Sequence, residues 1–216
     1  MINVENIEVF NWEGAIRGMR NPLNSWDKSD SDWEFVEDPS IINPNDEVKF
    51  VLGENDLALM RKLVKAGSDH RKFLRQILVS MDITAPLYWW KEFDTYKVGT
   101  TANSCSTMHT IHKKPFEVDD FSHERMSATA LRVIKRLVNF LELERKCYCE
   151  SKNREHWDDI IQLLPASYNQ KRTVTFNYEV LLNMYRSRKN HKLPEWHALC
   201  DCIENLPYFA EICLEK

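Results

Sequence analysis

The chain has 216 residues, of which 43% are hydrophobic, so it can form one substantial core, and we expect a single domain, 1–216. The net charge is −4, with acids and bases mixed along the sequence, which excludes the basic footprint of a protein that binds duplex nucleic acid. No apolar run reaches the ~18 residues of a membrane span, and the first residues lack the pattern of a signal peptide. We therefore expect a cytoplasmic protein that binds neither nucleic acid nor a membrane.

The six cysteines are typical of a cytosolic protein with reduced thiols. Two Cys-x-Cys pairs are present, Cys147 with Cys149 and Cys200 with Cys202, and both lie in helical patterns. Residues two apart in a helix point about 200° away from each other, whereas a tetrahedral zinc site usually takes its cysteines from a turn. We expect buried structural cysteines and no metal site.

A long polar segment, residues 21–46, interrupts the first part of the chain. Its prolines and its closely spaced Asp and Ser residues predict a surface excursion. Trp26 and Trp33 indicate that this excursion docks onto the rest of the protein. Around it we expect a strand at 3–12, a helical piece at 14–19 and a second strand at 47–52.

A helix and a strand are predicted next. Asn55 or Asp56 can cap the helix, which ends at Gly67. Residues 77–84 alternate between apolar and polar side chains, which predicts a strand with one buried face. His70 stands between the two elements, where a histidine is typical of a helix end or a turn.

Pro86 begins a helix rich in aromatic residues, which Gly99 ends. The aromatic side chains cover too much of the surface for one stripe, so this helix is either largely buried or shared with another subunit. The segment 100–107 that follows is small and mostly hydroxylated. Such a segment lets the backbone approach a ligand closely, and it also occurs in ordinary Ser/Thr loops.

The longest helix is expected at 123–149, with a core face and a solvated charged face. A short helix at 155–163 follows, and a helical stretch at 195–214 closes the chain. The predicted core positions of the long helix are Ala130, Val133, Ile134, Leu137, Val138 and Leu141, and its solvated positions are Arg132, Lys135, Arg136, Glu142 and Glu144.

The stretch 164–195 combines a polar extended piece with a helix that begins near Thr175 or Asn177. Asn177 and Arg188 lie eleven residues apart, which is close to three helical turns, so both would project from one face about 16 Å apart. That separation suits a long ligand with a polar group at one end and an anionic or carbonyl group at the other. The same two residues also fit a helix cap and a surface arginine.

These residues resemble the C-terminal part of the flavin-dependent thymidylate synthases. That family has the order LP, T.N, N, R and SHxxxE, with one residue more than this chain between the arginine and the histidine. The resemblance implies an α+β fold, in which helices pack on a mostly antiparallel sheet. The matching residues are Leu164, Pro165, Thr175, Asn177, Asn183, Arg188, His191 and Glu195.

Two upstream motifs of the family also have counterparts. His70 falls on the first histidine of the turn GHxSxxEH, although Arg75 replaces its glutamate. In the motif RHRxxSxNxxSxRY, Lys97 keeps one positive charge, Met108 replaces the last arginine, and Ile161 occupies a further arginine position. After a one-residue insertion, Thr101, Asn103 and Ser106 match Ser, Asn and Ser, and Ser104 replaces a glutamate.

The resemblance implies a role for each matching position. The implied contacts to FAD come from His70, Lys97, Asn103, Asn177, Asn183 and His191, those to substrate from Glu92, Ser104, Ser106 and Arg188, and the catalytic roles from Arg188 and Ser106.

In this family, reduced flavin mediates transfer of a methylene group from folate to C5 of deoxyuridine monophosphate, in homotetramers whose sites combine several subunits. The resemblance therefore implies a methyltransferase of nucleotide biosynthesis that binds FAD and a pyrimidine nucleotide. NADPH and methylenetetrahydrofolate are the candidate co-substrates.

The loss of two phosphate partners, at Met108 and Ile161, would remove roughly 3–6 kcal/mol of binding free energy and weaken nucleotide binding about 10²- to 10⁴-fold. His109 or His112 would have to replace them. Two alternatives stay open: a homologue that binds flavin or nucleotide without catalysis, and a purely structural oligomer.

Overall fold

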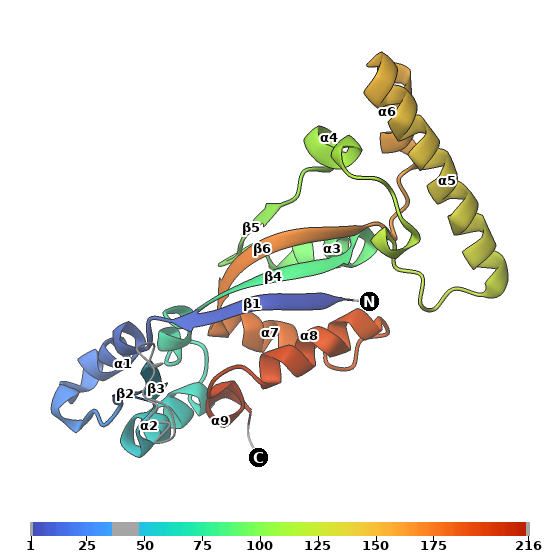
Figure 1. Ribbon diagram of the computed structural model, residues 1–216. Helices are drawn as coiled ribbons and strands as arrows, with labels where there is room; N and C mark the ends of the chain where they lie inside the picture. Colours follow the sequence, from blue (N-terminus) through green and yellow to red (C-terminus); the bar gives the residue numbers. More distant parts are fainter. Residues whose placement is uncertain (1, 36–47, 215–216) are drawn as a thin grey trace, which may run out of the picture. The chain divides into compact units, whose positions relative to one another are not determined.

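The computed structural model describes residues 2–35 and 48–214. Helices alternate with antiparallel sheets, which confirms the predicted α+β class (Figure 1). The larger sheet has the strand order β1-β4-β6-β5, and a smaller one pairs β2 with β3. The strands are β1 (Asn3–Phe10), β2 (Asp32–Phe35), β3 (Val48–Val51), β4 (Leu78–Pro86), β5 (Thr101–Ser104) and β6 (Asn169–Asn177).

The chain divides into two compact units, which are described separately. Strands β1, β4 and β6 and helix α8 (Pro194–Glu204) each continue from one unit into the other. The single domain therefore stays a prediction. The first unit comprises Met1–Ile7, Met81–Thr175 and Leu193–Leu199, and the second comprises Glu8–Ser80, Phe176–Lys192 and Cys200–Lys216.

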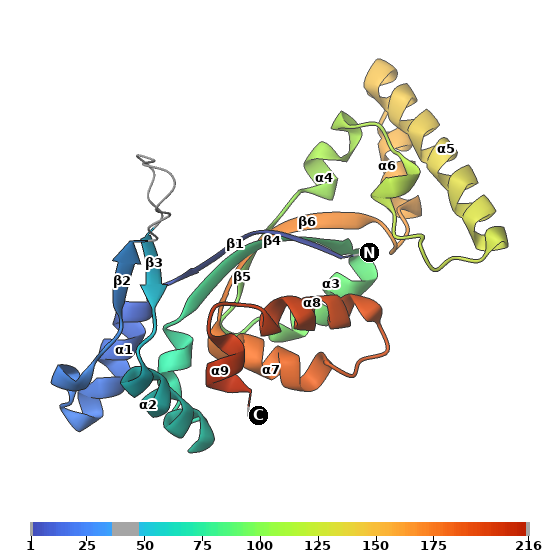
Figure 2. The ribbon, with the colours of Figure 1, turned by 60° about the horizontal axis from the view of Figure 1, so that its bottom comes forward.

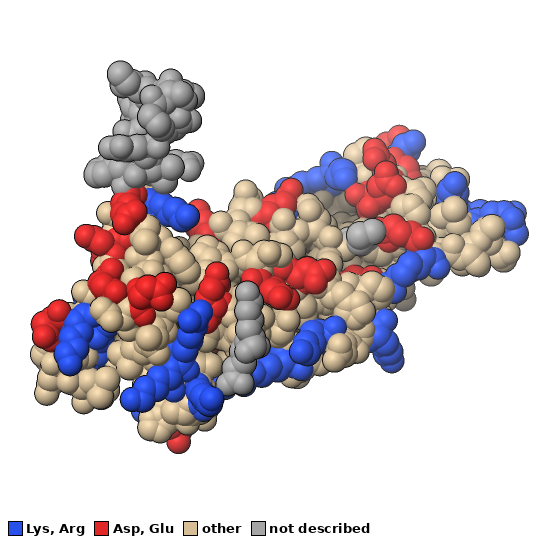
Figure 3. Space-filling model, turned by 90° about the horizontal axis from the view of Figure 1, so that it is seen from below, with Lys and Arg blue, Asp and Glu red and all other residues tan. Residues whose placement is uncertain are grey.

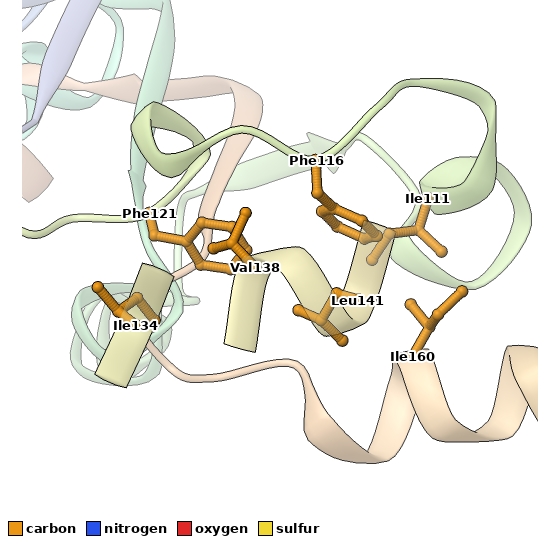
Figure 4. Close-up of a cluster of buried hydrophobic side chains, with 7 residues drawn as sticks. All are labelled: Ile111, Phe116, Phe121, Ile134, Val138, Leu141 and Ile160. Carbon is orange, nitrogen blue, oxygen red and sulfur yellow. The ribbon is translucent and has the colours of Figure 1, made fainter. Parts of the chain in front are cut away.

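In the first unit, α5 (Ala128–Ser151) and α6 (Arg154–Leu163) enclose a hydrophobic cluster (Figure 4). The long helix begins at 128 and not at 123, because the Ser127 side chain accepts a hydrogen bond from the Ala130 amide at 3.2 Å and caps it. Two predicted positions were wrong. Val133 is 63% exposed, and Glu144 is buried, where its carboxylate meets His156 Nδ1 at 2.6 Å. The cluster contains Ile111, Phe116, Phe121, Ile134, Val138, Leu141 and Ile160.

The aromatic helix is α3 (Leu87–Phe93), followed by a 3-10 turn, η4 (Asp94–Tyr96). Trp89, Trp90 and Phe93 are all at most 2% exposed within the single chain. The largely buried alternative is therefore correct, and these aromatic residues give no support to a subunit interface. The small-residue segment after this helix is partly a strand, β5, which pairs antiparallel with β6.

The second unit contains the excursion, which is more regular than a surface loop. Residues 21–35 form two 3-10 turns, η1 (Asn21–Leu23) and η2 (Trp26–Lys28), and strand β2, which pairs with β3. The remainder of the predicted excursion, 36–46, lies outside the described residues. Trp33 docks as expected: its Nε1 donates to Glu13 Oε1 at 2.8 Å, and its ring lies 5.3 Å from the ring of Phe50.

A buried carboxylate, Asp56, organises this segment. Neither Asn55 nor Asp56 caps the helix α2 (Glu54–Lys65), whose cap position is Gly53. Asp56 instead accepts hydrogen bonds from Arg20 Nε at 2.7 Å and from side-chain and backbone donors of 29–31. Burial alone would raise the pKa of Asp56, but the hydrogen bonds from Ser31, Ser29 and Arg20 hold it below its ordinary value. We call Arg20, Ser29, Asp30, Ser31 and Asp56 the Asp56 network.

The remaining helices of the second unit pack on its core. The stretch 195–214 is divided into α8 and α9, because Tyr208 adopts a positive φ of 55° before α9 begins. The other elements are α1 (Trp12–Arg20), η3 (Lys72–Arg75), α7 (Tyr178–Arg188) and α9 (Phe209–Cys213).

The burial of the cysteines and the distribution of charge on the surface test the expectations drawn from the composition. Cys200 and Cys213 are buried, and burial raises the pKa of Cys200 to about 11 and that of Cys213 to about 12. Among the cysteines of the two Cys-x-Cys pairs, Cys147, Cys149 and Cys202 are half-buried, so the prediction of buried cysteines is confirmed only for Cys200. Acidic and basic side chains are intermixed on the face shown in Figure 3. No helix in 2–35 or 48–214 combines the length and apolarity of a membrane span.

Candidate functional site

The N-terminus of α7 carries the first predicted ligand contact. Asn177 is its N-cap, and its Oδ1 accepts a hydrogen bond from the Val180 amide at 3.1 Å. The amide of Tyr178, the first residue of the helix, donates to the Ile77 carbonyl at 3.1 Å. The cap interpretation of Asn177 is therefore correct. Its amide nitrogen donates no hydrogen bond within residues 2–35 and 48–214, so a ligand contact by Asn177 can be a bond donated from this nitrogen or an additional one accepted by the shared oxygen.

A buried ion pair fixes His70 to this helix end. The neighbouring Arg71 donates from Nε to Glu179 Oε2 at 2.8 Å and from Nη2 to Oε1 at 3.0 Å. Glu179 lies in the first turn of α7. His70 itself is exposed, in a turn whose amides at 70 and 71 donate to the Gly67 carbonyl. The structure thus brings His70 and Asn177 to the same end of the second unit.

The other predicted residues of this unit follow α7 to its C-terminus. Asn183 is exposed, while Val180 and Met184 on the core side are buried. Arg188 is the last residue of the helix and is half-buried, and its carbonyl accepts a hydrogen bond from the His191 amide at 2.9 Å. Asn177 and Arg188 therefore mark the two ends of one helix, and their projection from a common face stays a prediction.

In the first unit, the predicted residues of β5 point to two different faces. Neighbours in a strand project to opposite sides of the sheet, so Asn103 and Ser104 do too. Asn103 pairs in register with Thr173, and Ser104 pairs with Arg172. One planar ligand lying on a single face can be contacted by only one of these two side chains.

The face of Asn103 holds a charged network around Asp82. Thr173 Oγ1 donates to Asp82 Oδ1 at 2.6 Å, Asn6 Nδ2 donates to Oδ2 at 2.9 Å, and Lys171 Nζ lies 3.0 Å from Oδ2. These donors, Thr173 first, lower the pKa of Asp82 to about 2. Asp82 is therefore a carboxylate throughout the physiological range.

The face of Ser104 holds a cation that sequence reasoning missed. The guanidinium of Arg172 lies 4.2 Å from the ring centroid of Trp90, and it donates to Asp94 at 3.2 Å and to Gln170 at 3.1 Å. Its side chain is 17% exposed. The strand-like alternation of side chains within 169–177 could have indicated this role of Arg172. It places position 172 beside the segment 100–107 if that segment is also a strand.

The remaining predicted residues of the first unit lie before and after β5 in the sequence. Ser106 caps the short helix α4 (Thr107–Thr110), and its Oγ accepts from the His109 amide at 3.0 Å. Lys97 is exposed, and Glu92 is half-buried in α3. The hydroxyl of Ser106 can still donate one hydrogen bond to a ligand.

The two positions where the family has arginine have different environments. Met108 is 49% exposed in α4, where an arginine could reach solvent or a ligand. Ile161 packs against the hydrophobic cluster of the first unit, so an apolar residue has a packing role there. His112 contacts Tyr148 edge-to-face at 5.1 Å, whereas His109 is exposed.

A polar cluster of the first unit surrounds Glu195, which the resemblance includes but whose partners the sequence did not indicate. Glu195 Oε1 accepts hydrogen bonds from Tyr88 Oη and, at 2.6 Å, from Arg125 Nη2. The Glu195 side chain is 4% exposed, and its Oε2 is buried with no hydrogen-bond partner in the described part of the chain. Burial and then the hydrogen bond to Glu195 raise the pKa of Tyr88 to about 12. Within 2–35 and 48–214, no group of three His, Cys, Asp or Glu residues could hold a metal ion.

The ten predicted site residues are thus distributed evenly between the units. The first unit holds Glu92, Lys97, Asn103, Ser104 and Ser106, and the second holds His70, Asn177, Asn183, Arg188 and His191.

Comparison with known proteins supports the fold. No protein-family model matches the chain, and no curated protein matches it in sequence. Similar solved structures include two crystal structures of thymidylate synthase X (ThyX) from Helicobacter pylori with FAD and dUMP. One has a TM-score of 0.67 and 17% identity over 99% of this chain and 98% of that chain. The other has a TM-score of 0.64 and 18% identity over 98% and 100%. This chain therefore has the fold of these enzymes along its whole length.

Proposed function

We propose that this protein binds FAD and a pyrimidine nucleotide and transfers a one-carbon group to C5 of the pyrimidine ring. The observation that carries the proposal is the likeness to the fold of two enzyme structures with FAD and dUMP, over at least 98% of either chain. A second support for the proposal is that polar residues of this chain follow one another in the same order as in the motifs of the flavin-dependent thymidylate synthases. Methylenetetrahydrofolate would be the one-carbon donor and NADPH the reductant.

The donor set of this chain fits a flavin. His70, Asn103 and Asn183 are all exposed, and their imidazole and amide groups can both donate and accept hydrogen bonds, as the polar edge of a flavin ring requires. Lys97 is an exposed cation suited to a phosphate. We assign flavin contacts to these four residues and to Asn177 and His191. FAD, when bound, supplies the electron-transfer chemistry.

The nucleotide is assigned to a second set of residues. Arg188 would donate two hydrogen bonds to the carbonyl edge of the ring and stabilise negative charge that develops there. Ser106, whose oxygen is held by the His109 amide, would donate from its hydroxyl to the nucleotide. Glu92 and Ser104 complete this set. We assign the catalytic roles to Arg188 and Ser106.

The proposal extends to the assembly and the compartment. We propose a homotetramer in the cytoplasm, in which sites combine residues of several subunits, and whose role is nucleotide biosynthesis. Shared sites would agree with the division of the predicted residues between two units of one chain.

A repurposed homologue that binds flavin or nucleotide without catalysis is the second candidate. It is favoured by Met108, an exposed residue without charge at a family arginine position, and by Ile161, which has a place in a hydrophobic cluster. Both residues reduce the positive charge available to a nucleotide phosphate.

Absorbance and calorimetry test the proposal. We expect the purified protein to have the visible absorbance of oxidised flavin, or to gain thermal stability when FAD is added. Asn183→Ala should weaken FAD binding, whereas Asn139→Ala, an exposed asparagine of α5, is the matched control and should not. The absence of both the flavin absorbance and a thermal shift at high FAD concentration would contradict the flavin assignment. Flavin binding without turnover of any pyrimidine nucleotide in the presence of both co-substrates would favour the second candidate.

A further inference from the structure

The second unit contains a cavity of about 300 Å³, and none of the residues assigned to flavin or nucleotide lines it. Its lining residues come from α1, from residues 26–31 and from β3, and Figure 2 shows α1 next to the β2–β3 pair. Ile16 and Phe50, 5% and 7% exposed, form an apolar wall, and Trp26, 52% exposed, forms another. Ligand pockets of proteins begin at about this volume and are lined mainly by apolar and aromatic side chains. The cavity can therefore take one aromatic ring.

The walls of the cavity are held in place by hydrogen bonds. Trp26 Nε1 donates to Asn21 Oδ1 at 2.8 Å, which fixes the orientation of the indole ring. Ser29 and Ser31, which also line the cavity, donate from their hydroxyls to Asp56 at 2.8 and 2.7 Å. A preformed pocket binds more tightly than one that must be ordered on binding.

The remaining lining carries one charge of each sign. Glu13 and Arg17 are exposed and lie one turn apart on α1, so they are neighbours on the helix surface. No ion pair joins them, nor does Arg17 donate a hydrogen bond to any other residue within 2–35 and 48–214. Trp33 Nε1 donates to Glu13 Oε1 and holds that carboxylate in place. Arg20, also in the lining, is neutralised by Asp56 at 2.7 Å.

We propose that this cavity binds a free aromatic amino acid. The ring would lie between Trp26 and the Ile16–Phe50 wall, the carboxylate would accept hydrogen bonds from Arg17, and the ammonium group would donate to Glu13. A zwitterion satisfies both charges, whereas an anion alone leaves Glu13 without a counterion and a cation alone leaves Arg17 without one. The proposal does not depend on the function proposed above, because none of these residues is assigned to flavin or nucleotide.

Calorimetric titration of the full chain with three related compounds tests the proposal. L-phenylalanine has both charges, 3-phenylpropanoate has only the carboxylate, and 2-phenylethylamine has only the ammonium. We expect L-phenylalanine to bind and each singly charged analogue to bind at least about tenfold more weakly, because one charge-assisted hydrogen bond is lost. Equal affinity for all three compounds, or no binding of L-phenylalanine at millimolar concentration, would overturn the proposal.

Two variants, each of which removes one charge, separate the roles of Arg17 and Glu13. Arg17→Gln should weaken the binding of L-phenylalanine and of 3-phenylpropanoate about tenfold but leave that of 2-phenylethylamine unchanged. Glu13→Gln should weaken the binding of L-phenylalanine and of 2-phenylethylamine about tenfold but leave that of 3-phenylpropanoate unchanged. Lys28→Gln is the matched control, because Lys28 is exposed nearby but does not line this cavity. Circular dichroism and the melting temperature show that each variant is folded. Loss of L-phenylalanine binding in the Lys28 control to the same extent would contradict the site.

Discussion

Arg71 and Glu179, 108 positions apart in the sequence, form a two-pronged ion pair with N–O distances of 2.8 and 3.0 Å, and their side chains are only 11% and 10% exposed. Removal of the arginine would leave a nearly buried carboxylate without its counterion. We expect Arg71→Leu to lower the free energy of unfolding by about 3–5 kcal/mol, measured by urea denaturation. Lys72→Leu, at an exposed neighbour, should change it by less than about 0.5 kcal/mol.

The double variant Arg71→Leu, Glu179→Leu distinguishes pairing from packing. It should recover part of the lost stability, since it removes the unpaired charge as well. A double variant less stable than Arg71→Leu alone would show that Glu179 has a further partner of its own.

Tyr88 gives a prediction for alkaline pH. Its pKa is raised to about 12 in the folded protein, against 10 as the ordinary value, because burial and Glu195 disfavour the phenolate. The folded state therefore holds this proton more tightly than the unfolded state does. The resulting stability is complete below pH 10 and is lost as the pH rises from 10 to 12. In this window the free energy of unfolding of the wild type should fall more steeply than that of Tyr88→Phe. Parallel curves would contradict the assignment.

Thymidylate synthesis should be weak or absent, because Met108 offers no positive charge to a phosphate. A strain that requires thymidine should not be rescued by the wild-type gene. Met108→Arg should tighten binding of deoxyuridine monophosphate about ten- to a hundredfold, which is the effect of one hydrogen bond to a charged group. Leu23→Arg, which adds the same charge at an exposed position of the other unit, is the control for non-specific attraction. Full rescue by the wild-type gene would show that other residues replace the lost arginines.

Arg188 is the residue on which the substrate assignment most depends. Arg188→Ala should leave the fold and flavin binding intact but weaken binding of the nucleotide by about 1.5–3 kcal/mol, or roughly ten- to a hundredfold. Calorimetry with deoxyuridine and deoxycytidine monophosphates and their nucleosides measures this. Arg186→Ala, an exposed arginine of the same helix, is the matched control. If the wild type binds one of these compounds and Arg188→Ala binds it equally well, Arg188 is only a surface residue.

An exposed apolar stripe on α5 is the reason to expect an oligomer, since the aromatic residues of α3 are buried within the single chain. Val133, Phe140 and Leu143 are 63%, 39% and 55% exposed and lie on one side of this helix, away from the core positions. We expect light scattering to give an oligomer for the wild type and a lower mass for Phe140→Asp. Asn139→Asp adds the same charge beside the stripe and should keep the wild-type mass. A monomeric wild type at micromolar concentration would refute the oligomer.

Periodicity predicted the regular elements well. The alternation at 77–84 is confirmed by Ile77, Val79, Met81 and Ile83, all 0% exposed, because a strand with one covered face has a pattern that few other structures share. A polar sequence wrongly predicted a loop where the segment is in fact a strand whose side chains have polar partners. The segment 100–107 reads as a loop, yet its first part is a sheet strand, since cross-strand hydrogen bonds need no apolar residue.

The partners of charged side chains could not be predicted. Glu144 has the spacing of a solvated position, but His156 on the next helix accounts for its burial. Arg172 and Glu195 likewise owe their environments to residues distant in the sequence. Helical spacing specifies the side of a helix on which a residue lies, whereas a charged residue on that side is buried or exposed according to the element that packs against it.

The Asp56 network makes a long, polar segment tolerant of sequence change. Two of the hydrogen bonds to Asp56 come from backbone amides, those of Asp30 and Ser31, which every residue except proline provides. These two bonds to Asp56 survive a change of side chain at 30 or 31, although the Asp30 carboxylate has a second role, since it accepts hydrogen bonds from the Asn55 and Asp56 amides at 2.9 and 3.1 Å. Backbone donors thus preserve part of the course of a polar segment while some of its side chains change, and this is one physical route to a shared fold at 17% identity.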